Sequence, residues 1–276
     1  MRLGTAALIA ARELREAMRS RWFVLAAGCF LVLSLGLALL GLAGAQRSGL
    51  AGFDRTTASL LNLALLFVPL VTLSLGGLGI AGELEDQSLA MLLAQPVTRL
   101  EVFAGKYLGL LAAVTAAIFV GFGTTGLLVG LRVGGNARAF ATLVGLTVLL
   151  GAATLAIGTL LSVALRSRAR VIGAAFSVWL LIVYVSDLGT IGLAIARSLA
   201  PGQVFLLALL NPVEQARVLG TLALTDRLEV LGPVGIFGID HLGTAGLVAL
   251  LVALLVAIAG ALLGAGYAIF RKAVVT

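Results

Sequence analysis

The only histidine, His241, follows Asp240, and such a pair can act as a base with its orienting carboxylate. No nucleophile motif accompanies the pair, so we interpret it as a polar pair at the end of an apolar segment. The three methionines and one cysteine lack the spacing of metal ligands, and the sequence contains no phosphate-binding G-x-x-x-x-G-K-[ST] motif. The chain is therefore predicted to be non-catalytic and to bind no metal or cofactor itself. If the chain works together with ATP and magnesium, another chain must bind them.

The composition is strongly apolar: 61% of the residues are hydrophobic and 11% are charged, against about 25% charged in an average soluble domain. An excess this large cannot be buried in one water-soluble core, so lipid is the expected solvent. The net charge of +7 comes from Lys and Arg at the ends of apolar runs, not from a basic patch with interleaved aromatics. This arrangement is typical of membrane proteins and disfavours nucleic acid as a partner.

Six apolar runs reach the length of about 20 residues that a spanning helix needs. They are residues 22–44, 58–82, 107–131, 139–165, 171–188 and 243–270. The runs are apolar on all sides and show no two-residue alternation, which disfavours outer-membrane β-strands. We predict an all-α, polytopic protein of a bacterial plasma (inner) membrane with six transmembrane helices. Lys and Arg are concentrated on the side that holds the N-terminus, which predicts that both termini are cytoplasmic.

Residues 1–21 precede the first run, and apolar residues recur there at spacings of three and four from Leu3 to Leu14. Because arginines occupy the other face, this pattern predicts an amphipathic helix on the cytoplasmic membrane surface. One alternative is that the segment extends the first span into water. Another is a cleaved signal peptide, which the length of the apolar run and the acidic Glu13 and Glu16 disfavour.

Glycine is frequent, with 35 residues in 276. Three pairs have the small-xxx-small spacing: Gly105/Gly109, Gly126/Gly130 and Gly260/Gly264. Such pairs allow helix backbones to approach closely in lipid, so they predict tight helix packing.

The most informative segment, residues 83–96, joins the second and third runs. Three acids open it, three leucines follow on one helical face, and a proline ends the helix. These residues are Glu83, Glu85, Asp86, Leu89, Leu92, Leu93 and Pro96. Thr98 and Glu101 then have the spacing of a capping box that begins the next helix. Lipid-surface helices favour basic residues, so an acidic face with a leucine stripe favours docking to a protein over a connector resting on the bilayer.

The run from Glu83 to Lys106 resembles the signature between the second and third spans of ABC-2 type permeases, the membrane subunits of ATP-binding-cassette transporters. The acidic start, the leucines, the Gln95-Pro96-Val97-Thr98-Arg99 stretch and the closing Gly105-Lys106 carry this resemblance. The six-span layout and the absent ATPase motif agree with it. The resemblance implies a type V exporter-like permease, with residues 1–276 forming one domain. It also implies that residues 83–96 form a coupling helix, whose acids, leucines and proline contact the ATPase subunit.

Within this family the chain is most similar to the NosY-type branch, which serves assembly of the copper centres of nitrous-oxide reductase. The resemblance implies three protein partners: a cytoplasmic NosF-like ATPase, a periplasmic NosD-like protein and a second copy of the chain. It further implies that residues 189–242 form a periplasmic loop with short re-entrant helices, in which Asn211, Pro212 and Glu214 contact the periplasmic partner. The cargo would be a sulfur species or copper, or the chain would do mechanical work on that partner.

Two other functions stay open. An ATP-independent carrier needs polar or charged residues along a path, and the only candidate charge inside a span is Asp187, which equally fits a helix end in the interface. A membrane scaffold for a maturation complex is the second alternative. The shortage of Met, Cys and His disfavours a copper relay through this chain. The sequence assigns no role to Asp187, Asp240 or His241.

Overall fold

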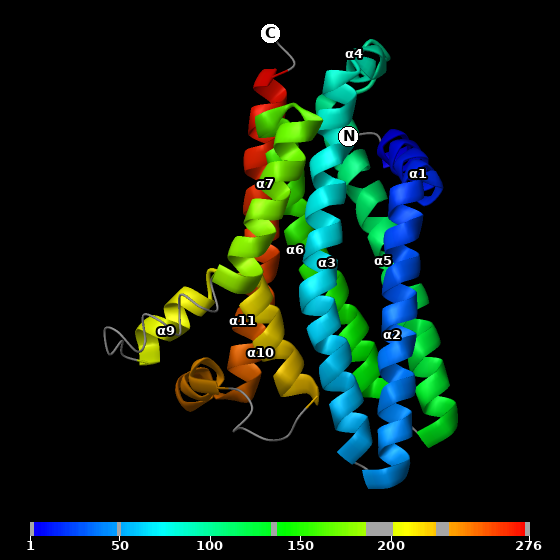
Figure 1. Cartoon of the computed structure of the whole chain (residues 1–276). Helices are drawn as coiled ribbons and strands as arrows, with labels where there is room; N and C mark the ends of the chain where they lie inside the picture. Colours follow the sequence, from blue (N-terminus) through cyan, green and yellow to red (C-terminus); the bar gives the residue numbers. More distant parts are fainter. Residues whose placement is uncertain (1–2, 49–50, 134–136, 186–200, 225–231, 274–276) are drawn as a thin grey trace.

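The computed structural model describes residues 3–48, 51–133, 137–185, 201–224 and 232–273. Within these ranges the chain forms helices and no strand, which confirms the predicted all-α class. The helices are α1 (Leu3–Arg19), α2 (Arg21–Ser48), α3 (Ala51–Glu85), α4 (Ser88–Leu93), α5 (Arg99–Val133), α6 (Ala137–Leu165), α7 (Arg168–Leu180), the π-helix η1 (Leu181–Val185), α9 (Pro201–Ala208), α10 (Pro212–Leu224) and α11 (Gly232–Ala273). The long helices form one bundle, with α1, α4 and the end of α11 at one end, called the α4 end below (Figure 1).

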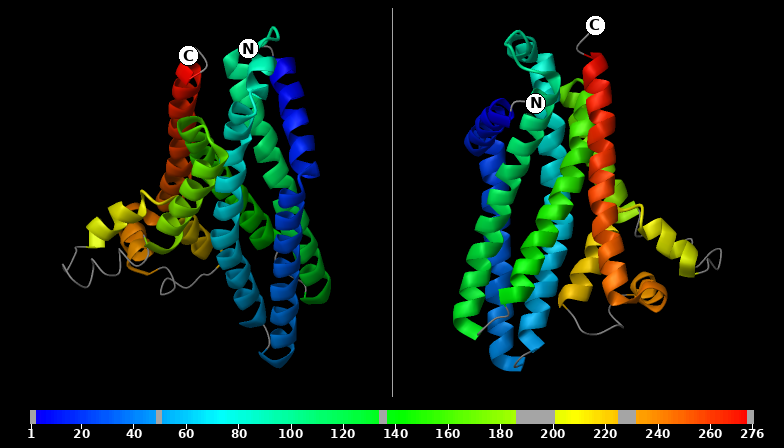
Figure 2. Two further views of the ribbon diagram at one scale, coloured as in Figure 1. Left: turned by 45° about the horizontal axis from the view of Figure 1, so that its top comes forward. Right: turned by 180° about the vertical axis from the view of Figure 1, so that it is seen from behind.

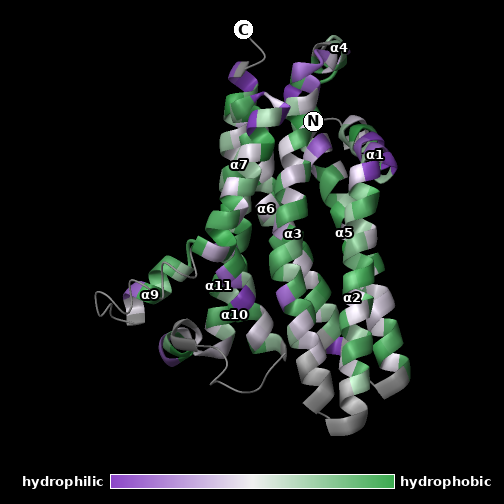
Figure 3. Ribbon diagram, in the orientation of Figure 1, coloured by the Kyte–Doolittle hydropathy of each residue, from purple (hydrophilic) through white to green (hydrophobic). Residues whose placement is uncertain are grey.

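Six of the described helical stretches are long and apolar enough to cross a membrane, in agreement with the prediction. They are Arg21–Ala43, Thr56–Glu85, Arg99–Leu131, Phe140–Leu165, Arg168–Val185 and Gly235–Lys272. Apolar residues follow the bundle along its length, whereas hydrophilic residues gather near α1 and α4 (Figure 3). Gly243, where the sixth run begins in the sequence, is a kink in α11 with a φ of 69°. The chain is therefore a multi-pass membrane protein.

Helix α1 is separate from α2 and crosses the bundle beside α5 (Figures 1 and 2). The alternative in which residues 1–21 extend the first span therefore does not describe this structure. Ile9 and Ala17 are buried, whereas Ala7, which belongs to the predicted apolar stripe, is exposed. The buried face is set by α5, because a Cβ on its Gly109 would lie 2.5 Å from the carbonyl oxygen of Ala10. Only glycine permits this approach of the two backbones.

The crossing of α3 and α6 has the most extensive contact among the described helices. Gly76 and Gly158 bring the backbones together, and a Cβ on Gly158 would lie 2.5 Å from the carbonyl oxygen of Leu73. The hydroxyls of Thr72 and Thr154 are 2.7 Å apart across the same contact. A hydroxyl contact of this kind contributes about 0.6 kcal/mol on average in a membrane. Close backbone packing therefore holds this crossing together.

We expect Gly158→Ala to destabilise the folded chain by about 1–3 kcal/mol, because the added methyl group must displace the backbone of α3. Gly145→Ala in the same helix is the matched control, since a Cβ there meets no atom within 4 Å. This control should keep or slightly raise stability, because alanine has the higher helix propensity. Thermal unfolding of both variants in one detergent measures the difference, and equal melting temperatures would contradict the close crossing.

The glycine pairs of the sequence have different surroundings. Helix α1 packs against both Gly105 and Gly109, and a Cβ on either glycine would lie within 3 Å of α1 atoms. Tight packing is thus confirmed for this pair. A Cβ on Gly260 or Gly264 would meet no atom within 4 Å, so that pair does not pack helices within the described chain.

Candidate functional site

The 83–96 segment differs from its predicted form at the acidic start. Helix α3 continues through Glu85, and a turn in which Gln87 has a φ of 59° separates it from α4. Glu83 and Glu85 therefore lie in the last turn of α3, and α4 keeps six residues, Ser88–Leu93. The prediction that acids open the helix is wrong. Lys106 of α5 binds Glu83, and the backbone N–H of Arg168 at the start of α7 donates to Glu85. These contacts offset the unfavourable position of negative charge at a helix C-terminus.

The predicted leucine stripe faces the chain itself. Leu89 is 2% exposed and belongs to an apolar cluster with Ile9 of α1 and Phe103 of α5. Leu92 packs against the same cluster and is partly buried. The side chain of Leu93 lies outside the described residues. Leu89 and Leu92 therefore fix α4 to the bundle, and burial of this kind contributes about 1.5–3 kcal/mol for a full leucine side chain.

The outward face of the 83–96 segment is formed by other residues. Met91 lies about 200° around the helix from Leu89, and it is 78% exposed. Gln95 and Pro96, in the turn that follows α4, are also exposed. The sequence contained a signal for this face, because Met91 is the large apolar residue that interrupts the leucine spacing.

The capping box predicted at the start of α5 is confirmed. The backbone N–H of Thr98 donates to Glu101 Oε2 at 3.0 Å, and the backbone N–H of Glu101 donates to Thr98 Oγ1 at 3.3 Å. Reciprocal bonds of this kind satisfy the free N–H groups at a helix start. The direction in which the chain re-enters the bundle after α4 is thus fixed locally.

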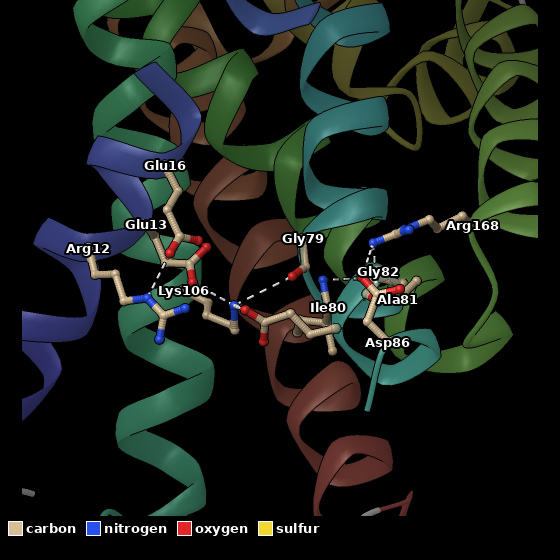
Figure 4. A network of polar contacts seen from close by, with 12 residues as sticks. Arg12, Glu13, Glu16, Gly79, Ile80, Ala81, Gly82, Asp86, Lys106 and Arg168 are labelled. Carbon is tan, nitrogen blue, oxygen red and sulfur yellow. Dashed lines mark hydrogen bonds and ion pairs between the residues drawn. The ribbon is translucent and has the colours of Figure 1, made fainter. Parts of the chain in front are cut away.

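One buried lysine joins three helices at the α4 end (Figure 4). The Nζ of Lys106, on α5, lies 2.6 Å from Glu13 Oε1 of α1 and 2.7 Å from Glu83 Oε1 of α3. It also lies 3.5 Å from the carbonyl oxygen of Gly79. The Lys106 side chain is 1% exposed, and those of Glu13 and Glu83 are 7% and 19% exposed. Buried charges at these distances are stable only when they are paired, so the three residues act as one unit.

Sequence reasoning missed Glu13 as a member of this network, because it treated the residue only as evidence against a signal peptide. Burial raises the pKa of the Glu13 carboxyl above its usual value, and the nearby Lys106 opposes this shift. Glu83 and Glu16 raise it further. Beside the network, Arg12 donates to Glu16 at 2.7 Å in an exposed pair. Hydrogen bonding to Glu16 raises the pKa of Arg12, which is charged at any physiological pH.

Glu16, beside the network, lies close to its two carboxylates, and such a group of three is a candidate for a metal site. One oxygen from each of Glu13, Glu16 and Glu83 lies within 4.8 Å of the others. The ammonium of Lys106 already contacts two of these carboxylates at hydrogen-bonding distance. We therefore interpret the arrangement as an ion-pair network and assign no metal ion to it.

A second polar contact binds the start of α7 to the end of α3. The backbone N–H of Arg168, at the start of α7, donates to Glu85 Oε2 at 2.8 Å. Its guanidinium donates to the Asp86 carboxylate and to the carbonyl oxygen of Gly82 (Figure 4). Because the Arg168 and Asp86 side chains are about half exposed, the pair itself contributes roughly 0–1 kcal/mol. All three predicted acids of the segment thus bind cations or backbone of this chain.

The residues predicted to contact a periplasmic partner begin α10. Asn211 is 6% exposed, accepts the backbone N–H of Val213 at 2.9 Å, and donates to the carbonyl oxygen of Ile182 in η1 at 2.7 Å. Pro212 is buried, and Glu214 is partly exposed and pairs with Arg217 at 2.9 Å. Asn211 therefore caps α10 and binds the π-helix at the end of the fifth span.

The His–Asp pair of the sequence does not form a catalytic contact. The Nδ1 of His241 lies 2.9 Å from the carbonyl oxygen of Phe237, and the His241 ring stacks on the Phe237 ring with a centroid distance of 4.1 Å. Asp240 is exposed. Both residues lie in α11, shortly before its kink at Gly243. Asp187 lies outside the described residues.

Comparison with known proteins gives one family. The family model described as ABC-2 family transporter protein matches residues 7–274. A protein of Stutzerimonas stutzeri named probable ABC transporter permease protein NosY is 32% identical over 271 residues, which cover 96% of this chain and 97% of that protein. A protein of Pseudomonas aeruginosa with the same name is 31% identical over 218 residues, which cover 76% of this chain and 79% of that protein.

Proposed function

Since this chain belongs to the ABC-2 transporter family and is a permease subunit of an ABC transporter, we propose that it couples ATP hydrolysis by a separate cytoplasmic ATPase subunit to transport or to work on a periplasmic partner. The process it serves is assembly of the copper centres of nitrous-oxide reductase. The similarity to two permeases named NosY supports this assignment. The ATPase subunit binds ATP and magnesium, and the permease binds no cofactor.

The coupling mechanism is supported by the two sides of the 83–96 segment, one packed on the bundle and the other exposed. Its inner side is fixed to the bundle by Leu89, while Met91, 78% exposed, faces outward. The segment directly joins the second and third spans, α3 and α5. A push on its outward face is therefore applied to both spans at once, which then tilt as rigid bodies.

Each end of the bundle has its own proposed protein partner. A NosF-like ATPase docks on the outward face of the 83–96 segment, and a NosD-like protein binds the opposite end, where Glu214 is partly exposed. A second copy of the chain completes the membrane part. Both termini are cytoplasmic in a bacterial inner membrane, since arginines and lysines concentrate at that end.

The interior of the spans favours coupling over an ATP-independent carrier. Several buried hydroxyls of the described spans bond to carbonyl oxygens of their own helices, as Thr154 does to Leu150 and Thr125 to Gly121, both at 2.8 Å. Such hydroxyls do not offer the charged or proton-relaying path that secondary carriers use. A sulfur species, copper or mechanical work on the partner each fit this permease, and the few Met, Cys and His residues disfavour a copper relay within it.

The test is affinity purification of the tagged chain from its native membrane, followed by identification of the proteins bound to it. We expect an ABC-type ATPase and a periplasmic protein, together with ATP hydrolysis by the complex in nanodiscs. Cells without the chain should produce nitrous-oxide reductase that lacks copper centres, and the intact gene should restore them. The copper centres should stay absent in a strain that has the chain but an ATPase unable to hydrolyse ATP. Complete copper centres in that strain would contradict coupling and favour a membrane scaffold.

A further inference from the structure

The Lys106 network joins elements that are distant in the chain. Lys106 and Glu13 are separated by 93 residues, and their contact connects the N-terminal helix α1 to α5. Glu83 lies in the last turn of α3, two residues before α3 ends and the turn to α4 begins. A single ammonium group thus binds both α1 and the start of the 83–96 segment.

We infer that Lys106 is a positioning residue that makes α1 move together with the 83–96 segment, because its ammonium ties Glu13 of α1 to Glu83 of α3. This inference rests on the proposed function, in which the ATPase displaces that segment. It assigns α1 a role in coupling beyond attachment to the membrane surface.

Packing supports the same connection independently of charge. Ile9 of α1 and Leu89 of α4 belong to one apolar cluster. The glycines on either side of Lys106 along α5, Gly105 and Gly109, bring α1 against α5 with backbone contacts that a Cβ would block. Helix α1 therefore shares an apolar cluster with α4 and packs closely on α5, on either side of Lys106 along that helix.

The charges make separation of the parts unfavourable. If α1 moved away alone, Glu13 would leave a lysine that is 1% exposed, and the remaining charges would stay buried with one partner fewer. If the end of α3 moved away alone, Glu83 would leave Lys106, and the charges that stay behind would again lose one partner. Uncompensated buried charge is costly, so displacement of both carboxylates together with Lys106 is the favoured motion.

The test measures the distance between α1 and the 83–96 segment with spin labels at Leu8→Cys and Ser88→Cys, both exposed positions, in a Cys29→Ser background. The wild-type network should give one narrow distance distribution, equal in the nucleotide-free and ATP-bound complex. The neutral variant Glu13→Gln with Lys106→Met and Glu83→Gln removes every charge of the network and leaves no carboxylate unpaired. We expect a broad distribution that changes with nucleotide, and a yield of mature nitrous-oxide reductase per ATP hydrolysed that is at least tenfold lower.

The matched control is Arg12→Gln with Glu16→Gln, which removes an exposed ion pair from the same helix and should change neither readout. Narrow, unchanged distances in the neutral variant would overturn the inference, as would wild-type distances that change with nucleotide. Lys106→Arg, which keeps the charge, should restore part of the narrow distribution. If no ATPase binds the wild-type chain, the proposed function fails. The spin-label distances in the isolated permease then still test whether Lys106 holds α1 to the 83–96 segment.

Discussion

Replacing Met91 with aspartate is expected to separate the permease from its ATPase subunit while leaving the folded permease in the membrane. Met91 is 78% exposed, so its side chain contributes little to the fold of the free chain. In the complex that we propose, it becomes the apolar centre of the contact with the ATPase. Burial of a methionine side chain contributes about 1.5–3 kcal/mol, and a buried unpaired carboxylate adds a further penalty. Since about 1.4 kcal/mol corresponds to a factor of ten, binding should weaken at least about 100-fold.

Co-purification with the ATPase and the melting temperature of the free permease measure these two effects separately. Met91→Leu is the matched control, because it keeps an apolar side chain of similar size and should retain the complex. Leu89→Asp gives the contrasting result: Leu89 is 2% exposed, so this variant should lose the fold of the α4 end before it loses the partner. A Met91→Asp permease that still captured the ATPase at wild-type yield would contradict docking at this face.

The contrast between Met91 and Leu89 shows where sequence reasoning succeeds and where it stops. Hydrophobic run length predicts the six spans, since each depends on composition within one helix. The capping box of Thr98 and Glu101 is equally local, because both partners lie within one helical turn. The leucine spacing correctly predicts a helical face. It does not reveal what that face packs against, because the face packs into an apolar cluster formed by several helices of the same chain.

The acids of the 83–96 segment were misplaced for a related reason. A local pattern assigns Glu83 to a helix start, where negative charge is favoured. The structure places it at a helix end, where Lys106 binds it from 23 residues further along the chain. Glu13 is more distant still, and no local pattern connects it to Lys106. Charged residues near the ends of apolar runs therefore need tertiary information before a role can be assigned to them.

Lys106→Met is expected to destabilise the permease by about 3–5 kcal/mol, because it leaves Glu13 and Glu83 buried without their cation. Lys272→Met, the same substitution at an exposed lysine, is the matched control and should change stability by about 0.5 kcal/mol or less. Adding Glu13→Gln and Glu83→Gln to Lys106→Met should recover most of the loss. Replacing a complete buried ion-pair network with neutral groups is often tolerated, whereas removal of one partner is not.

The loss should also depend on pH, in a direction set by Glu13. Burial raises the pKa of this carboxyl in the folded chain, so the folded chain binds its proton more tightly than the unfolded chain does. The resulting stability is fully present below the usual glutamate pKa and is lost as the pH rises through the raised value. Without Lys106, which opposes the shift, the pKa rises further and the dependence becomes steeper. Lys106→Met should therefore melt at a lower temperature at pH 8 than at pH 5, while the fully neutral variant should show little difference between the two. A Lys106→Met permease with equal melting temperatures at both pH values would contradict a buried, proton-binding Glu13.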